Sequence, residues 1–255
     1  MRKFGLIGYP LGHSFSKRFF NERFFPENGI DAEYLNFEIP HPEMLLDIVR
    51  DNPDLQGLNC TIPYKQAIIP LLDELSKDAL EAGAVNVIGI ERVPSGKTMD
   101  GRGFRLKGFN SDIIGFRDSI VPLLRPHHRN ALILGTGGAS KAVCIVLSRL
   151  GIEWTYVSRT AKRNQLTYGD LTPELMYKHS IVVNCSPVGM YPNVDDCPDI
   201  PYDAISDKHL LYDLVYNPTE TAFMKRGAAM GAVVKNGLEM LELQAMAAWE
   251  FWNLS

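Results

Sequence analysis

A glycine-rich turn separates an apolar run from a helical pattern in the stretch NALILGTGGASKAV. Gly135 and Gly137 suit a tight turn whose backbone N–H groups can approach a pyrophosphate, and the dipole of the following helix favours the same anion. Gly138 and Ala139 lead into that helix, and Ser140 replaces the third glycine of the usual fingerprint, which requires room for a hydroxyl. The order of strand, turn and helix favours dinucleotide binding over a plain tight turn.

Basic residues follow the next predicted strand, about 20 residues after the glycine turn, where dinucleotide-binding folds select their cofactor. The chain reads YVSRTAKRN there, with Arg159, Lys162 and Arg163, and no carboxylate lies between Ser158 and Asn164. An acid at this place would suit the ribose 2′-OH of NAD, whereas the planar donors of arginine suit the 2′-phosphate of NADP. The cluster therefore favours NADP, and the alternative is a solvated basic start of a helix.

Polar side chains gather at predicted strand ends in the first part of the chain. GYPLGHSFS places the hydroxyls of Ser14 and Ser16 at a helix start, which suits a carboxylate, although either serine could be only an N-cap. The other polar residues are Asn59 and Thr61 on one side of a strand, Lys65 in the next helix, Asn86, and Asp112. A lysine and an aspartate near amides provide what carbonyl reduction needs, namely a proton donor, its partner and groups that orient the substrate. Each residue alone is more often a surface charge or a turn residue.

Strands and helices alternate along the chain, which predicts an α/β protein with parallel sheets and crossover helices. The predicted strands are KFGLIG, YLNFEI with Leu35, Phe37 and Ile39 inward, GLNCT, AVNVIGIE, FRLKGFN, ALILG, IEWTYVS, SIVVNCS, HLLYDLVY and AVVKNG. The predicted helices are SFSKRFFNERFF, MLLDIVRD, PYKQAII, SKDALEAG between Ser76 as N-cap and Gly83 as stop, SDIIGFRDSIVPLL, ASKAVCIVLSRLG, PELMYKH, TAFMKRGAAM and a last helix over 238–252.

Two domains are expected from the chain length of 255 residues, because domains cluster at roughly 100–150 residues. The last helix carries an apolar stripe and is expected to return to the first domain. We expect a substrate-binding, catalytic domain at 1–112 and 238–255 and an NADP-binding, Rossmann-type domain at 113–237. The active site is expected in the cleft between them.

Composition excludes several classes of function. The 26 Lys and Arg and 30 Asp and Glu give a net charge of −4 and are scattered, which argues against binding to nucleic acid or an anionic membrane. No apolar run approaches about 18 residues, and the first residues show no signal-peptide pattern. Cys60, Cys144, Cys185 and Cys197 lack zinc spacing, so we expect reduced thiols, no metal site and a cytoplasmic protein.

Taken together, these stretches resemble the shikimate dehydrogenase family. GYPLGHSFS, NCTIPYK, GAVNVI, GFNSD, GTGGAS, SRTAKR, NCSPVGM, DLVYNPTET and NGLEMLELQA follow one another in the family's order and at its spacing, over almost the whole chain. So large an ordered set is highly specific. The resemblance implies an NADPH-dependent, reversible reduction of 3-dehydroshikimate to shikimate, on the way to chorismate and the aromatic amino acids, by a monomer or homodimer.

The resemblance also implies roles for single residues. Lys65 and Asp112 match the family's catalytic pair. The matching substrate contacts are Ser14, Ser16, Asn59, Thr61, Lys65, Asn86, Asp112, Tyr216 and Gln244. The matching cofactor contacts are Gly135, Gly137, Gly138, Ala139, Ser158, Arg159, Thr160, Arg163, Val215, Gly237 and Met240, the last two beside the nicotinamide.

Two positions depart from the family pattern. Lys17 stands where proline is usual and adds a positive charge near the expected carboxylate site, and Ser158 stands where asparagine is usual. The segment 92–105 carries four basic residues, matches no motif and keeps an open role. Two rival functions remain, a sister enzyme that also oxidises quinate or uses NAD, and a cofactor-sensing module without turnover. The lack of an acid in the basic cluster argues against the first, and the intact Lys65 and Asp112 argue against the second.

Overall fold

The structure, a computed structural model, describes the chain except residues 13–14, 95–100, 161, 163 and 255. It divides into two compact units, which we call unit 1 (Met1–Ser111 and Ala245–Ser255) and unit 2 (Asp112–Gln244). Within the described residues each unit contains a six-stranded sheet. The predicted α/β class is confirmed. In the part of the chain that the structure describes, no helix has the length and apolar character needed to cross a membrane.

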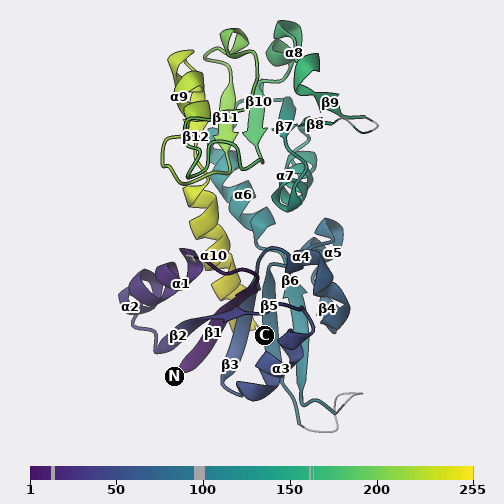
Figure 1. Ribbon diagram of the computed structural model, residues 1–255, viewed down its shortest axis with the longest axis vertical. Helices are drawn as coiled ribbons and strands as arrows, with labels where there is room; N and C mark the ends of the chain where they lie inside the picture. Colours follow the sequence, from purple (N-terminus) through teal and green to yellow (C-terminus); the bar gives the residue numbers. More distant parts are fainter. Residues whose placement is uncertain (13–14, 95–100, 161, 163, 255) are drawn as a thin grey trace. The chain divides into compact units, whose positions relative to one another are not determined.

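The sheet of unit 1 has the strand order β2-β1-β3-β5-β6-β4, seen in the lower part of Figure 1. Its strands are β1 (Arg2–Gly8), β2 (Ala32–Glu38), β3 (Leu55–Cys60), β4 (Glu74–Leu75), β5 (Val87–Arg92) and β6 (Phe104–Phe109). β1 is parallel to β2 and β3, whereas β5 is antiparallel to β3 and β6. The prediction of parallel sheets is therefore wrong for β5. Between β3 and β5 the chain forms the short strand β4, which is parallel to β6. As a result β5 begins at the edge of the sheet where β3 ends, and it runs in the opposite direction.

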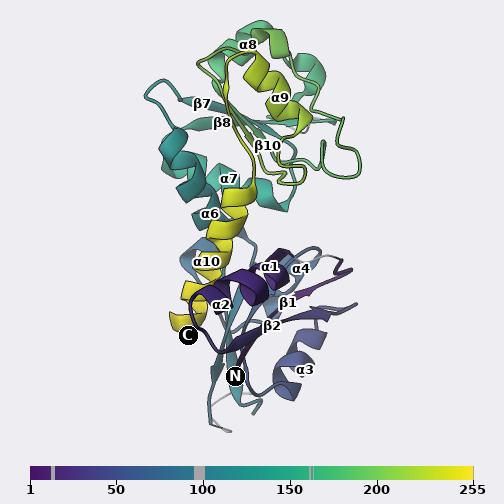
Figure 2. The same ribbon diagram turned by 90° about the vertical axis from the view of Figure 1, so that its left-hand side faces the viewer.

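Helices cover both faces of this sheet. They are α1 (Phe15–Arg18), the π-helical η1 (Phe19–Phe24), α2 (Phe25–Glu27), α3 (Met44–Asp51), α4 (Tyr64–Ala67), η2 (Ile69–Leu71), α5 (Lys77–Ala82) and the end of α10 (Leu238–Leu254). Figure 2 shows α3 on one side of the sheet and α2 with the end of α10 on the other. The predicted ends of α5 are confirmed, because the Ser76 hydroxyl accepts a hydrogen bond from Ala79 N and Gly83 has a φ of +56°.

The face of the sheet opposite α3 has an aromatic core. The rings of Phe20 and Tyr34 stack with centroids 5.0 Å apart, and those of Phe4 and Trp252 stack at 4.7 Å. Tyr34 is fully buried, whereas Leu35 of the same strand is only half-buried. The sequence pattern of β2 predicted one buried face, but side chains of both faces are covered. Tyr34 thus lies within the protein rather than on its surface.

The sheet of unit 2 has the order β12-β11-β10-β7-β8-β9, and all its strands are parallel. The strands are β7 (Asn130–Leu134), β8 (Glu153–Ser158), β9 (Leu166–Thr167), β10 (Ile181–Asn184), β11 (Leu210–Asp213) and β12 (Val233–Lys235). The helices are α6 (Asp112–Ile120), η3 (Val121–Leu123), α7 (Gly138–Arg149), η4 (Tyr168–Asp170), α8 (Pro173–Lys178), η5 (Tyr202–Ala204), α9 (Ala222–Ala229) and the start of α10. Parallel strands end at one edge of a sheet, so the loops after β7, β8, β10 and β11 meet there.

Helices also cover both faces of the unit 2 sheet. Met176 of α8 and Phe223 of α9 are fully buried in one core with apolar side chains of the central strands. On the other face Phe116 of α6 packs edge-on against Tyr212 with ring centroids 5.2 Å apart. A Cβ atom at Gly115 would lie 2.6 Å from the Met240 carbonyl oxygen, so α6 and the start of α10 approach closely. Burial on both faces explains why these strands are continuous apolar runs in the sequence.

We predict that Gly57→Ala destabilises unit 1. A Cβ atom at Gly57 would lie 2.1 Å from Cδ1 of Trp252, a ring that is itself buried against Phe4. Overpacking of this kind should lower the free energy of unfolding by about 1–3 kcal/mol. Urea titration of the variant and of wild type would measure the difference. Gly12→Ala is the control, because a Cβ atom at Gly12 meets nothing within 4 Å. Equal unfolding free energies for the two variants would contradict the packing described here.

Candidate active site

The glycine turn lies between β7 and α7 at the carboxyl edge of the unit 2 sheet. Gly135 has a φ of +98°, and a Cβ atom there would lie 3.3 Å from Cβ of Ser186, so the turn itself requires glycine. At Gly137 a Cβ atom would meet only the Cys185 oxygen, at 3.9 Å, and at Gly138 it would meet nothing within 4 Å. No described protein atom explains these two glycines. Both positions leave room for the predicted approach of a pyrophosphate to the backbone.

A pocket of about 590 Å³ opens beside this turn. The loops after β7, β8 and β10 form its walls together with two segments that the sequence did not single out. The lining residues are Gly135, Thr136, Gly137, Ser158, Arg159, Tyr168, Cys185, Ser186, Pro187, Val188, Cys197, Pro198 and Asp199. The pocket therefore combines the predicted pyrophosphate turn and the predicted phosphate-binding arginine in one cavity.

The basic cluster lies at the end of β8. The Ser158 hydroxyl donates a hydrogen bond to Thr160 O at 2.9 Å and accepts one from Thr160 N at 3.3 Å, which closes a tight turn around Arg159. Burial raises the pKa of Tyr168, and the nearby positive charge of Arg159 offsets part of the rise. Arg163 lies outside the described residues. The end of β8 thus presents an exposed guanidinium to the pocket, as a phosphate site requires.

An acidic residue, Asp199, lines the same pocket. The sequence-based choice of NADP depended on the absence of a carboxylate between Ser158 and Asn164, and Asp199 lies far from that segment in the chain. Nothing local in the sequence marks it, because it belongs to an irregular connection between β10 and β11. The pocket therefore holds charges of both signs.

Ser140 fits into the helix in place of the third glycine. Its side chain is fully buried, and its hydroxyl donates a hydrogen bond to Gly137 O at 2.6 Å. The Tyr156 hydroxyl lies 3.2 Å from Ser140 Oγ and accepts a hydrogen bond from Cys144 Sγ at 3.0 Å. Ala139 beside it is half-buried in the first turn of α7. The room that a serine requires is therefore present, and the hydroxyl stabilises the turn.

Three of the predicted cofactor residues are Val215, which follows β11, Gly237, which follows β12, and Met240 in the first turn of α10. Gly237 N donates a hydrogen bond to Val215 O at 3.1 Å. A Cβ atom at Gly237 would lie 2.2 Å from Leu214 O, so only glycine permits this approach. Val215 is buried, and Met240 is buried in the first turn of α10. The structure thus brings Val215 and Gly237 together beside the start of that helix.

A chain of buried hydrogen bonds connects three of the predicted substrate residues of unit 1, namely Ser16, Asn59 and Asn86. Tyr34 OH donates to Asn59 Oδ1 at 2.7 Å, and Asn59 Nδ2 donates to Asn86 O at 3.2 Å. Asn86 Nδ2 in turn donates to Ser111 Oγ at 3.0 Å, and Ser111 N donates to Asn86 Oδ1 at 2.7 Å. Burial raises the pKa of Tyr34, and a hydrogen bond from Ser16 offsets part of the rise. The chain therefore runs from Ser16 to Ser111.

Tyr34 and Ser111 are members of this chain that the sequence did not assign to the site. Ser111 stands at the start of a predicted helix, and Tyr34 lies in a predicted strand whose inward residues were expected to be Leu35, Phe37 and Ile39. Ser14, the other predicted hydroxyl, lies outside the described residues. Asn59 and Asn86 are nearly inaccessible to solvent, at 6% and 3% exposure, so their amides are fixed by these bonds.

Thr61 and Lys65 lie just beyond the end of β3, and both are half-buried. Thr61 O accepts a hydrogen bond from Tyr64 N at 2.9 Å, and Lys65 O accepts one from Val85 N at 2.7 Å. Burial raises the pKa of Cys60 to about 12, and the positive charge of Lys65 offsets part of the rise. The Lys65 ammonium group is therefore positioned near the same strand end as the amide of Asn59.

Three predicted substrate residues belong to unit 2. Asp112 follows Ser111 directly, begins α6 and is half-buried. Gln244 is buried in α10, where its Nε2 donates to Leu241 O at 3.0 Å. Tyr216 is exposed after β11. The pairing of Asp112 with the lysine of unit 1 stays a prediction.

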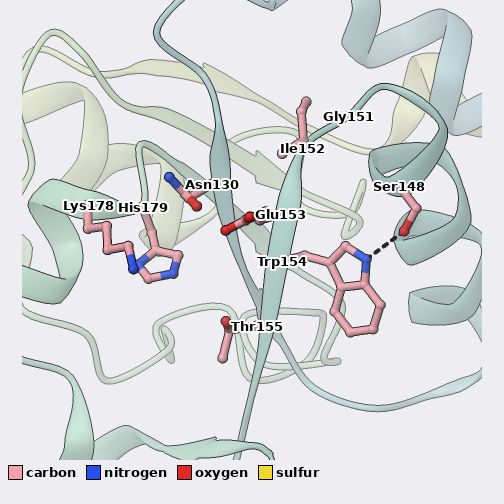
Figure 3. A pocket seen from close by; sticks show the side chains of 9 residues that line it. All are labelled: Asn130, Ser148, Gly151, Ile152, Glu153, Trp154, Thr155, Lys178 and His179. Atoms are coloured by element: carbon pink, nitrogen blue, oxygen red, sulfur yellow. Dashed lines mark hydrogen bonds between the residues drawn. The ribbon is translucent and has the colours of Figure 1, made fainter.

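Another pocket, of about 550 Å³, lies at the opposite edge of the unit 2 sheet, by the amino ends of β7 and β8 (Figure 3). In it Trp154 Nε1 donates to Ser148 Oγ at 2.9 Å, and His179 Nδ1 lies 2.8 Å from Leu175 O. No motif of the sequence analysis predicts this pocket. Nowhere in the described part of the chain do three or more His, Cys, Asp or Glu side chains form a group that could hold a metal ion.

Comparison with known proteins gives consistent matches. Residues 6–88 match the family model of the shikimate dehydrogenase substrate binding domain. The NADP(+) shikimate dehydrogenase of Halothermothrix orenii is 35% identical, over 98% of this chain and 90% of that protein. The crystal structure of shikimate 5-dehydrogenase from Thermus thermophilus with NADP(H) and shikimate matches at TM-score 0.81 and 29% identity, covering 99% and 93% of the chains. That from Listeria monocytogenes with shikimate and NAD matches at TM-score 0.82 and 27% identity, covering 100% and 92%.

Gly137→Ala is expected to separate folding from cofactor binding. Because a Cβ atom meets only one protein atom, at 3.9 Å, the unfolding free energy should change by no more than about 0.5 kcal/mol. The methyl group would keep a pyrophosphate from the backbone, so the KM for NADP+ should rise about tenfold or more. Gly135→Ala, with its φ of +98°, should lower the melting temperature as well. An unchanged KM in Gly137→Ala would mean that the turn binds no pyrophosphate.

Proposed function

Because the chain belongs to the shikimate dehydrogenase family, we propose that it catalyses the reversible, NADP-dependent reduction of 3-dehydroshikimate to shikimate. The observation that carries this proposal is the pair of glycines Gly137 and Gly138, which protein packing does not require. Gly137 lines the same pocket as Arg159. A backbone that a pyrophosphate can approach, combined with a guanidinium at the adenosine end, suits NADP.

NADP is held by unit 2 in this proposal. The backbone of the glycine turn, from Gly135 to Ala139, and the N-terminus of α7 bind the pyrophosphate. Arg159 binds the 2′-phosphate. Val215, with Gly237 and Met240 beside it, forms the wall at the nicotinamide. When bound, the cofactor supplies or accepts the hydride at the carbon that carries the reacting oxygen.

The substrate is held by residues of unit 1 together with the unit 2 residues Tyr216 and Gln244. The hydroxyls of Ser14 and Ser16 bind the carboxylate, and the exposed Lys17 raises the local positive potential. The buried amides of Asn59 and Asn86, with Thr61, orient the ring hydroxyls by hydrogen bonds. Because these amides are already fixed by neighbours, little conformational entropy is lost when substrate binds.

Lys65 and Asp112 carry out the proton transfer in this proposal. The Lys65 ammonium delivers the proton to the substrate oxygen in the direction of reduction, and Asp112 orients the lysine and the substrate hydroxyl. In the direction of oxidation the same pair removes the proton. The assignment of substrate to 1–112 and 238–255 and of NADP to 113–237, the cytoplasmic location and the monomeric or homodimeric state stay predictions.

Arg159→Ala is expected to weaken the binding of NADP+ far more than the binding of NAD+. A charge-assisted hydrogen bond to the 2′-phosphate contributes about 1.5–3 kcal/mol, so the KM for NADP+ should rise roughly ten- to hundredfold. NAD+ lacks this phosphate, and its KM should change little. Lys178→Ala is the control, since it removes a positive charge at the other edge of the same sheet. Equal losses for the two cofactors would show that the basic cluster is only a solvated helix start.

Lys65→Ala and Asp112→Ala are each expected to lower kcat for shikimate oxidation by about 10²–10⁴, the range for a positioned acid–base group. The KM for NADP+ should stay nearly unchanged, because neither residue lines the adenosine pocket. The double variant should be little slower than the slower single variant, since the two groups act as one unit.

Lys107→Ala is a matched control for the lysine, because Lys107 pairs with Glu74 on the exposed side of strand β6. A near-normal kcat in Lys65→Ala would refute the assigned proton donor. A wild-type protein that binds NADP+ but oxidises no shikimate would favour a cofactor-sensing module.

A further inference from the structure

Asp213, the last residue of β11, is a fully buried carboxylate that the proposed reaction does not use. Its Oδ1 accepts hydrogen bonds from Asn184 Nδ2 at 2.9 Å and from Val215 N at 3.0 Å. Its Oδ2 accepts one from Thr221 Oγ1 at 2.7 Å. All three partners are neutral donors. Burying a charge in this way is expensive, so a carboxylate here requires a reason beyond packing.

The donors explain why the residue is an acid and not an amide. Thr221 Oγ1 already accepts a hydrogen bond from Met224 N at 3.3 Å, as the N-cap of α9, so its hydrogen points to Asp213. Three donors converge on two oxygen atoms, and only an ionised carboxylate offers acceptors alone. An asparagine would direct an N–H group at one of these donors.

The bonds extend from Asp213 to the wall of the cofactor pocket. Asn184 Oδ1 accepts hydrogen bonds from Ser186 N at 3.1 Å and Ser186 Oγ at 2.7 Å. Ser186 lines the pocket and lies against Gly135, the first glycine of the turn. Val215, bound to the same carboxylate, accepts the bond from Gly237 N. One carboxylate thus connects the loops after β7, β10, β11 and β12, neighbours in the sheet of Figure 1.

We propose that Asp213 is a positioning residue for NADP(H), whose negative charge holds the loop at Ser186 and the backbone at Val215 in the geometry that binds the cofactor. This inference rests on the proposed function, since it concerns the same cofactor. The residue touches neither cofactor nor substrate. It acts through the donors that it fixes.

The ionisation of Asp213 offers a readout. Burial raises its pKa to about 6, and the hydrogen bonds from Thr221, Val215 and Asn184 limit the rise. Among the described residues, the titratable groups that face it are Cys185 and Tyr202, and burial raises the pKa of both. Both are therefore neutral near pH 6, where Asp213 gains its proton. Protonation would replace one acceptor by a donor and break one of the three bonds.

The test measures the dissociation constant of NADP+ by fluorescence quenching, for wild type and for Asp213→Asn, at pH 7.5 and pH 5.5. At pH 7.5 the variant should bind about tenfold more weakly, the scale of a lost charge-assisted bond. At pH 5.5 the ratio of the two constants should fall toward one, because the wild-type carboxyl is then protonated. The 2′-phosphate also titrates here, but it affects both proteins alike and cancels in the ratio.

Tyr212→Phe is the first control. Tyr212 precedes Asp213 on β11, is equally buried, and bonds to Ser119 Oγ at 2.6 Å on the other face of the sheet. Loss of this buried bond should lower the melting temperature and leave NADP+ binding unchanged. Two results would overturn the proposal and leave Asp213 a structural role only. One is a ratio of the NADP+ dissociation constants of Asp213→Asn and wild type that lies within about twofold of one at pH 7.5, and the other is a ratio that is the same at both pH values.

A second pair of variants keeps the test decisive if Asp213→Asn does not fold. Thr221→Ala removes the donor to Asp213 together with the N-cap of α9. Thr172→Ala removes the N-cap of α8, where Thr172 Oγ1 accepts from Leu175 N at the same 3.3 Å. Both should lose thermal stability, Thr221→Ala more than Thr172→Ala because it also leaves the buried carboxylate of Asp213 with one donor fewer. Only Thr221→Ala should weaken the binding of NADP+, and Thr221→Ser should restore that binding. Equal NADP+ affinity in the two alanine variants would overturn the proposal.

The binding measurement does not depend on turnover. Wild-type protein that binds NADP+ but oxidises no shikimate would overturn the proposed function, while the comparison of Asp213→Asn with wild type would still decide the role of the carboxylate.

Discussion

A polar group buried in a protein must find a hydrogen-bond partner, and in both units this requirement fixes the ends of the strands. In unit 1 the side chain of Tyr34 donates a hydrogen bond to that of Asn59, which in turn donates one to the backbone oxygen of Asn86. In unit 2 Asp213 and Asn184 do the same. No member of either chain can move without leaving another unpaired, at about 1–3 kcal/mol for each orphaned group. The ends of these strands are therefore held by side-chain hydrogen bonds as well as by the sheets.

The glycine turn is likewise held by hydrogen bonds within the protein. The Gly137 carbonyl accepts hydrogen bonds from both the backbone and the side chain of Ser140, so the shape of the turn is set by the protein itself. Gly135 N is likewise bonded, to Val157 O at 2.8 Å. A turn held in this way does not have to be ordered by its ligand, and binding energy is not consumed in ordering it. The serine in the third glycine position therefore contributes to the turn.

The sequence predicted the parts of the site that depend on local patterns. Apolar periodicity located the main strands and helices, and glycine spacing located the turn, because each is a property of a short window of chain. Tyr34 could not be assigned, since its importance comes from a partner, Asn59, on another strand. The antiparallel direction of β5 also escaped prediction, because it depends on β4, a strand of two residues. Asp199 reaches the pocket through an irregular loop that has no pattern to recognise.

Cofactor preference depends on more than the basic cluster. The acid that would select NAD is absent from the end of β8, but the parallel sheet gathers its loops at one edge and so brings Asp199 into the pocket of Arg159. An arginine attracts a 2′-phosphate and an aspartate repels it, and in a partly enclosed pocket both effects exceed their value in water. If Arg159 binds the 2′-phosphate as proposed, the preference for NADP over NAD is the difference between two opposed charges, and a loop distant in sequence contributes to it together with the residues of the motif.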